Sequence, residues 1–260
     1  MLVRKLSAAI RRQDWFQVLV EILIVVVGIL IALQVDNWND DRKARVQAEV
    51  WRQQIIADLN QNIRDLEGRL KYSQQALAFG EAALAGIEAA DAPTGDAVWD
   101  TVLGAFQAGQ IWPYRLTGPS YREVQSAGGL GLIGSERAQA ALAYLYDVSA
   151  HDFELVSGGL PQYRQQIRER MPWPIQSHIW DSNCQIGSGL SGLALDFDQF
   201  ELVRCAEPAD KALMRKALDQ LRSDAELQSG LRGRLSQLKV SASAIGRLVE
   251  RARQVQALLQ

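Results

Sequence analysis

Acidic side chains are the first residues of this sequence whose position could support chemistry. Glu21 is the only charged residue in the stretch 18–35, which is otherwise almost wholly apolar. If this stretch crosses a bilayer, Glu21 lies about 9 Å along the helix axis from Trp15, where an ionised carboxylate is costly. Three interpretations of Glu21 stay open: pairing with a basic residue in an assembly, reaching the membrane interface, and proton transfer.

The candidate metal ligands are a short acidic segment and two histidines. Asp196, Asp198 and Glu201 could supply oxygen atoms to calcium, but the segment lacks the glycine-containing loop of an EF-hand, which favours a solvated acidic turn. His151 and His178 are the two histidines, and neither belongs to a zinc-binding spacing. We therefore predict no metal site and no cofactor.

Motifs for covalent catalysis and nucleotide binding are missing from the sequence. There is no G-x-S-x-G, no P-loop and no G-x-G-x-x-G after a strand. The formal net charge is −2, and the basic residues form no stripe of the kind that a phosphate backbone requires. We predict no catalytic residues and no nucleic-acid partner.

Two cysteines, Cys184 and Cys205, are the whole thiol content of the chain. A disulfide between them would close a loop rich in glycine and proline and would imply an oxidising compartment. The alternative is two separate reduced thiols.

The apolar stretch predicts a transmembrane helix over residues 18–38. Trp15 and Phe16 precede it and Trp38 follows it, and Trp15 to Trp38 spans about 34 Å of helix, which suits a hydrocarbon core roughly 30 Å thick. No A-x-A cleavage site follows the stretch, which disfavours a signal peptide. The basic tail 1–17 favours a cytoplasmic N-terminus, although basic residues beyond the stretch balance it.

One face of this predicted helix carries Glu21, Val25, Gly28 and Ala32. The spacing of Gly28 and Ala32 lets a second helix backbone approach closely, which favours self-association. The alternative is that these are ordinary small residues of a membrane span.

Residues 39–260 are predicted to form a helical bundle. The predicted fold class is therefore all-α: a single N-terminal transmembrane helix followed by an elongated extramembrane bundle. Apolar stripes predict long helices over about 43–90, 135–170 and 208–258, and shorter helices near 97–107 and 120–127. Residues 172–207 are expected to form an irregular disulfide loop. Several aromatic residues in the middle of the chain could line a ligand pocket, a partner surface or the core: Trp99, Trp112, Tyr114, Tyr121, Trp173 and Trp180.

Two stretches of the chain carry motifs. The first, at the predicted span, contains Glu21, Gly28, Gln34, Asn37, Trp38 and Asn39, and the second contains Tyr121, Glu123, Ser126, Leu130, Leu132 and Ile133. Together they resemble a family of uncharacterised bacterial single-span inner-membrane proteins. Ala127 stands where the family often has glycine. The resemblance implies an inner-membrane protein and names no substrate, cofactor or partner.

These features favour a periplasmic helical scaffold or interaction module that is anchored in the bilayer, self-associates and engages another envelope protein. The alternative is a ligand-sensing module or an accessory subunit of a larger membrane complex. An enzyme of unrecognised class is the third possibility.

Overall fold

The computed structural model describes residues 15–157, 159–186 and 200–260. These residues divide between two units, 1–52 and 53–260, and helix α2 (Trp15–Glu88) contributes to both. The other elements of the described chain are helices, apart from one pair of two-residue strands. The all-α prediction is confirmed: a long N-terminal helix with an apolar stretch is followed by further helices.

The first unit presents the apolar stretch of α2 to its surroundings. Among the described residues, α2 is the one helix long and apolar enough to cross a membrane, and the apolar stretch of this helix is not buried. Ile24 keeps 66% of its surface exposed and Leu30 keeps 59%. Gly28 and Trp38 lie in the same exposed stretch, and no heavy atom outside the helix lies within 4 Å of a Cβ built on Gly28.

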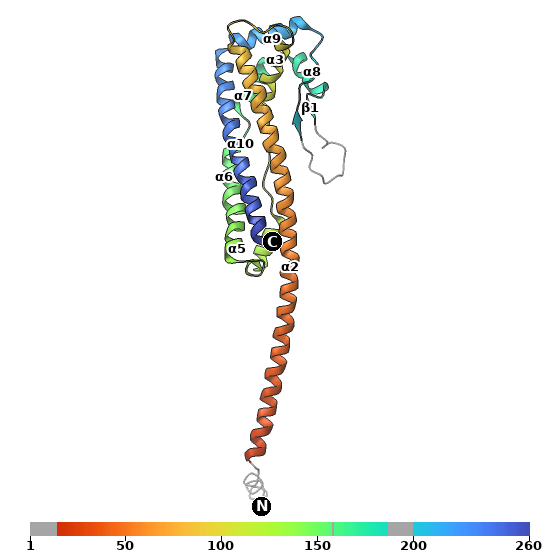
Figure 1. The fold of residues 1–260 in the computed structure, drawn as a ribbon, viewed down its shortest axis with the longest axis vertical. Helices are drawn as coiled ribbons and strands as arrows, with labels where there is room; N and C mark the ends of the chain where they lie inside the picture. Colours follow the sequence, from red (N-terminus) through yellow and green to blue (C-terminus); the bar gives the residue numbers. More distant parts are fainter. Residues whose placement is uncertain (1–14, 158, 187–199) are drawn as a thin grey trace, which may run out of the picture. The chain divides into compact units, whose positions relative to one another are not determined.

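The second unit contains the remaining elements (Figure 1). They are α3 (Asp96–Ala108), α4 (Pro119–Ser126), η1 (Leu130–Leu132), α5 (Glu136–Ala143), η2 (Tyr144–Ser149), α6 (Ala150–Ser157), α7 (Gln162–Arg170), α8 (Trp173–Asp181), β1 (Gln185–Ile186), β2 (Glu201–Leu202), α9 (Lys211–Ser223) and α10 (Ala225–Leu259). Strands β1 and β2 pair antiparallel, with Gln185 opposite Leu202.

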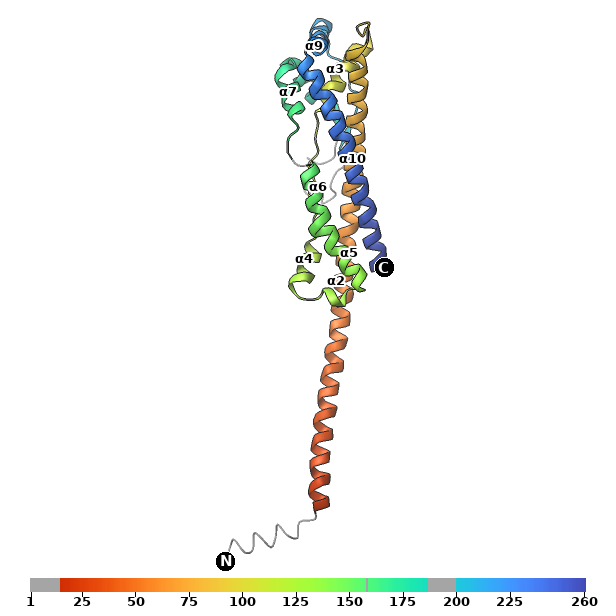
Figure 2. The same cartoon turned by 90° about the vertical axis from the view of Figure 1, so that its left-hand side faces the viewer.

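Helix α10 runs antiparallel to the part of α2 in the second unit. Arg232 near the start of α10 forms an ion pair of 2.6 Å with Glu88 at the end of α2, whereas Arg253 near the end of α10 pairs with Glu67. Helices α5 and α6 pack along the C-terminal half of α10, and α3 and α7 pack against its first half (Figure 2). The bundle is thus built on two long helices.

The largest core cluster lies where α3 meets α7, α8, α9 and α10, and it includes Trp99, Phe106, Ile175, Leu218 and Leu231. Gly104 allows α3 to approach α2, because a Cβ at this position would stand 2.5 Å from the Phe79 carbonyl oxygen. The close approach is therefore specific to glycine.

The stretch 135–170, predicted as one long helix, consists of four elements. Ser135 caps α5 by accepting a 3.3 Å hydrogen bond from the Ala138 N–H. A π-helix, η2, then joins α5 to α6, with the Ala150 N–H bonded to the Leu145 carbonyl oxygen five residues back. The helical conformation ends between α6 and α7, where Gly159 has a φ of +94° and Leu160 is 74% exposed.

Two other stretches also differ from expectation. The stretch 208–258, predicted as one helix, contains two, α9 and α10. They are separated at Asp224, whose carboxylate caps α10 by accepting a hydrogen bond of 2.9 Å from the Leu227 N–H. The irregular loop 172–207 contains the helix α8, with Pro174 in its first turn, where a proline costs no helical hydrogen bond.

Candidate functional site

A groove of about 640 Å³ opens on the surface of the second unit. Its walls come from α2, the segment 110–115, the connection between α6 and α7, and α10. A volume of this size is typical of sites for small molecules. The lining contains aliphatic and aromatic side chains as well as arginines and glutamines, so a ligand could make both apolar and charged contacts.

Trp112 forms the centre of an aromatic wall in this groove. Its ring makes edge contacts with Tyr72 at 5.7 Å and Phe200 at 4.8 Å between ring centroids. The Arg69 guanidinium stacks on two rings of the wall, 4.1 Å from the Trp112 centroid and 4.4 Å from that of Tyr114. These contacts hold the wall in one arrangement and place a cation beside it.

Three further arginines donate hydrogen bonds to Gln110. We call them the arginine cluster: Arg164, Arg168 and Arg234. Arg164 donates to the Gln110 side-chain oxygen at 2.7 Å, and Arg168 donates to the same atom at 3.5 Å. Arg234 donates from Nη2 to the Gln110 carbonyl oxygen at 2.9 Å and from Nε to the Ala108 carbonyl oxygen at 3.0 Å. The cluster therefore surrounds the C-terminus of α3.

In the described chain, none of the three arginines of the cluster forms an ion pair with a carboxylate. Burial, with repulsion from Arg164, lowers the pKa of Arg234 to about 10. This side chain is 6% exposed and still protonated at neutral pH. Glu154, an acid of the groove wall, is engaged by Arg115 at 2.9 Å. The described lining thus carries an excess of positive charge.

Two buried polar atoms at the groove have no hydrogen-bond partner, the Tyr72 hydroxyl and the Gln110 side-chain nitrogen. Each residue is 3% exposed. Burial raises the pKa of Tyr72, so its hydroxyl keeps its proton at neutral pH and can donate. An unsatisfied buried donor costs about 1–3 kcal/mol, and native structures contain few of them, so two in the lining of one groove are unusual.

The sequence comparisons concern the N-terminal part of the chain. Residues 21–83 match a family of unknown function, DUF6090. The predicted resemblance to an uncharacterised domain family is confirmed over this segment, which includes Glu21 at one end and the groove residues Arg69 and Tyr72 near the other. No curated protein and no solved structure is significantly similar to the chain.

Only some of the aromatic residues singled out in the sequence lie at the groove. Trp112 and Tyr114 line it. Trp99 is buried in the core, Tyr121 donates a 3.0 Å hydrogen bond to Asp147, and Trp173 and Trp180 are exposed on α8.

Sequence reasoning missed Tyr72, Gln110 and the arginine cluster. Arg234 offered one signal, since it stands three residues after Leu231 and four before Leu238 on the buried face of α10, where a charge is unexpected.

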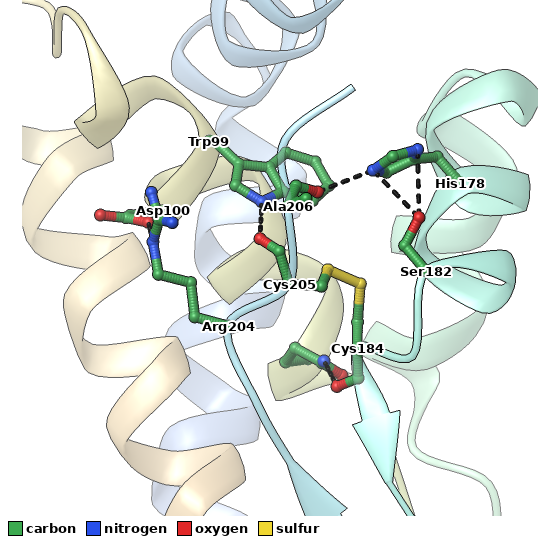
Figure 3. Close-up of a disulfide and its surroundings, with 9 residues drawn as sticks. Trp99, Asp100, His178, Ser182, Cys184, Arg204, Cys205 and Ala206 are labelled. Carbon is green, nitrogen blue, oxygen red and sulfur yellow. Dashed lines mark hydrogen bonds and ion pairs between the residues drawn. A yellow bond between two sulfur atoms is a disulfide. The ribbon is translucent and has the colours of Figure 1, made fainter. Parts of the chain in front are cut away.

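The predicted disulfide joins Cys184 to Cys205 beside the core (Figure 3). Gln107 donates to the Cys184 carbonyl oxygen at 2.7 Å, and the Trp99 indole donates to the Cys205 carbonyl oxygen at 3.0 Å. A ring nitrogen of His178 lies 2.7 Å from the Ala206 carbonyl oxygen. These bonds tie both ends of the disulfide to α3 and α8, so its surroundings are structural.

One of the residues considered as calcium ligands forms an ion pair. Glu201 pairs with Lys71, while Asp196 and Asp198 lie outside the described residues. In the ranges the structure describes, no three histidine, cysteine or acidic side chains cluster as a metal site. The predicted membrane face of Glu21, Val25, Gly28 and Ala32 belongs to the first unit, whereas the groove belongs to the second.

Proposed function

We propose that the protein is a membrane-anchored binding module whose extracytoplasmic helical domain holds a small ligand in the groove, as a sensor or as an accessory subunit of a membrane complex. The observation that carries the proposal is the groove itself. It combines an aromatic wall around Trp112, cations without carboxylate partners in the described chain, and two unsatisfied buried polar atoms. Such convergence of polar groups in an apolar concavity is typical of ligand sites.

The exposed apolar stretch of α2 supports the membrane anchor. Side chains such as Ile24 and Leu30 would expose aliphatic surface to water along a continuous run, which is strongly unfavourable outside a bilayer. Trp38 is placed at the end of this run, where an aromatic side chain suits a membrane interface. The basic residues of the tail 1–17 favour a cytoplasmic N-terminus in the bacterial inner membrane.

The disulfide supports a periplasmic position for the second unit. Disulfides persist in oxidising compartments and are rare in the cytoplasm. Cys184 is fully buried and Cys205 is 7% exposed, so the bond is part of the fold and not an exposed reactive pair.

Self-association through the predicted transmembrane helix is a second candidate role. It corresponds to the scaffold that the sequence analysis favours. It is favoured by the open space around Gly28 on the face shared with Glu21 and Ala32. This role is compatible with ligand binding, because the two sets of residues belong to different units.

Native mass spectrometry of the full chain, released from membranes in mild detergent, tests the binding proposal. Ser241 lines the groove on α10, so Ser241→Tyr would fill part of it without removing an arginine. We expect a small-molecule adduct on the wild-type chain that is lost in Ser241→Tyr. Bare mass in both proteins, or an adduct that survives the substitution, would contradict the proposal.

Topology is tested separately with Gln260→Cys, which adds a thiol to a chain whose own cysteines are bonded. A membrane-impermeant maleimide should label this variant in intact spheroplasts. Labelling only after lysis would place the C-terminus in the cytoplasm and refute the periplasmic assignment.

A further inference from the structure

We infer that the groove is a site for an amphiphilic organic anion, whose carboxylate is held by Arg234, Tyr72 and Gln110 and whose alkyl or aryl body lies along the wall of Trp112. This inference rests on the proposed function in one respect, that the groove takes a small molecule. It names the chemical class of that molecule.

The charge at the groove favours an anion. Three arginines line it, Arg69, Arg115 and Arg234, against one acid, Glu154, while Arg164 and Arg168 bond to the side chain of Gln110. Among the described residues, the lining therefore carries two more basic than acidic side chains. A cationic ligand would be repelled, and a neutral ligand would leave this imbalance in place.

The donors at the groove match a carboxylate. The Tyr72 hydroxyl and the Gln110 side-chain nitrogen have no acceptor, and three hydrogen bonds engage the five N–H groups of Arg234. A carboxylate only accepts hydrogen bonds and has about four sites for them. One carboxylate could therefore satisfy the hydroxyl, the amide and the remaining guanidinium donors together, with bonds strengthened by charge.

Tyr72 links the arginine cluster to the apolar part of the groove. The charges of Arg164, Arg168 and Arg234 act on its hydroxyl, while its ring packs edge-on against Trp112. Aliphatic side chains continue the apolar lining next to this ring, among them Ala76, Leu238 and Ile245. A ligand with a carboxylate at one end and an apolar body at the other fits both parts.

Calorimetry on the full chain in nanodiscs tests the inference with three matched probes: 3-phenylpropionate, 3-phenylpropionamide and 3-phenylpropylamine. They share one body and differ in charge, and octanoate replaces the aryl body with an alkyl chain. We expect at least one of the two carboxylates to bind more than tenfold tighter than the amide, and the amine not to bind. Equal binding of acid and amide, or no binding of either carboxylate, overturns the inference.

Tyr72→Phe tests the contact itself. Because the hydroxyl has no protein partner, its removal should leave the melting temperature unchanged or higher, while carboxylate affinity falls about tenfold. Tyr163→Phe is the matched control: its hydroxyl donates to the Ala105 carbonyl oxygen at 2.7 Å, so melting should fall and affinity should stay. Unchanged affinity in Tyr72→Phe would remove Tyr72 from the site.

Gln110→Glu places a carboxylate of the protein among the same arginines. We expect this variant to melt at a higher temperature and to lose carboxylate binding, since it supplies its own anion. Full binding in Gln110→Glu would refute the site. If no carboxylate binds but the native adduct persists in the wild-type chain, only the chemical class is wrong; if both are absent, the proposed function fails as well.

Discussion

Gly104 on α3 faces the backbone carbonyl of Phe79 on α2, at a distance that leaves no room for a side chain. A Cβ at this position would meet the carbonyl oxygen at 2.5 Å. Since both partners lie in helices of the packed core, neither can move without disturbing the core.

We therefore predict that Gly104→Ala destabilises the second unit by at least about 2 kcal/mol. Gly233→Ala on α10 is the control, because nothing lies within 4 Å of its Cβ, and it should stabilise by about 0.5–1 kcal/mol through helix propensity. Urea unfolding followed by circular dichroism measures both values. Equal stability of the two variants would show that the close approach is absent.

The disulfide leads to a second prediction. It links residues separated by 21 positions, and the chain-entropy model assigns about 3 kcal/mol to a loop of this length. The double variant Cys184→Ser and Cys205→Ser should lose about that much unfolding free energy, and the wild-type chain should lose a similar amount in reductant. A reductant effect that persists in the double variant would point to a cause other than this bond.

Alkaline pH should unfold the domain partly through Tyr121. Burial, and then the hydrogen bond to Asp147, raise the pKa of this phenol to about 12. The unfolded chain ionises near pH 10, so the stability from this group is complete below pH 10 and is lost as the pH rises toward 12.

The loss amounts to about 2 kcal/mol, and Tyr121→Phe should show a shallower decline of stability between pH 10 and 12. Urea titrations at several pH values measure the decline. The same slope in both proteins would exclude Tyr121 as the responsible group.

The membrane face makes a prediction of its own. Gly28→Cys should form a disulfide-linked dimer in membranes under mild oxidation, because its backbone is open to a second helix. Leu30→Cys, about 200° around the same helix, is the matched control and should crosslink poorly. Equal crosslinking of both variants would indicate random collisions, and no crosslinking of either would contradict association through this face.

Much of the helical architecture could be predicted from the sequence, because apolar periodicity and the residues that begin or end helices are local signals. Residues 96–108 and 119–126 form helices close to their expected ranges, and Gly128, with a φ of +70°, follows the second one. The sequence did not predict α8, because prolines such as Pro172 and Pro174 usually interrupt helices. In the structure they stand just before α8 and in its first turn, where proline is tolerated.

Local signals of this kind could not predict the groove. Arg69, Gln110 and Arg234 lie far apart in the chain, and α3 has to end at Ala108 before three arginines can bond around Gln110. Pairing of this kind depends on tertiary packing and has no sequence period. Conversely, the face of Glu21 and Gly28 could be named from sequence alone, because it lies on a single helix.

The π-helix η2 also matters for comparing this chain with others. A single π turn holds one residue more than an α-helical turn, so the buried face after Leu145 is shifted by one position relative to the face before it. Arg251 fixes this arrangement by stacking on Tyr144 and donating to the Ser149 hydroxyl at 2.5 Å. A relative with a regular helix here would align correctly only with a one-residue gap between 144 and 149. Searches that forbid gaps inside helices would lose the register of everything that follows.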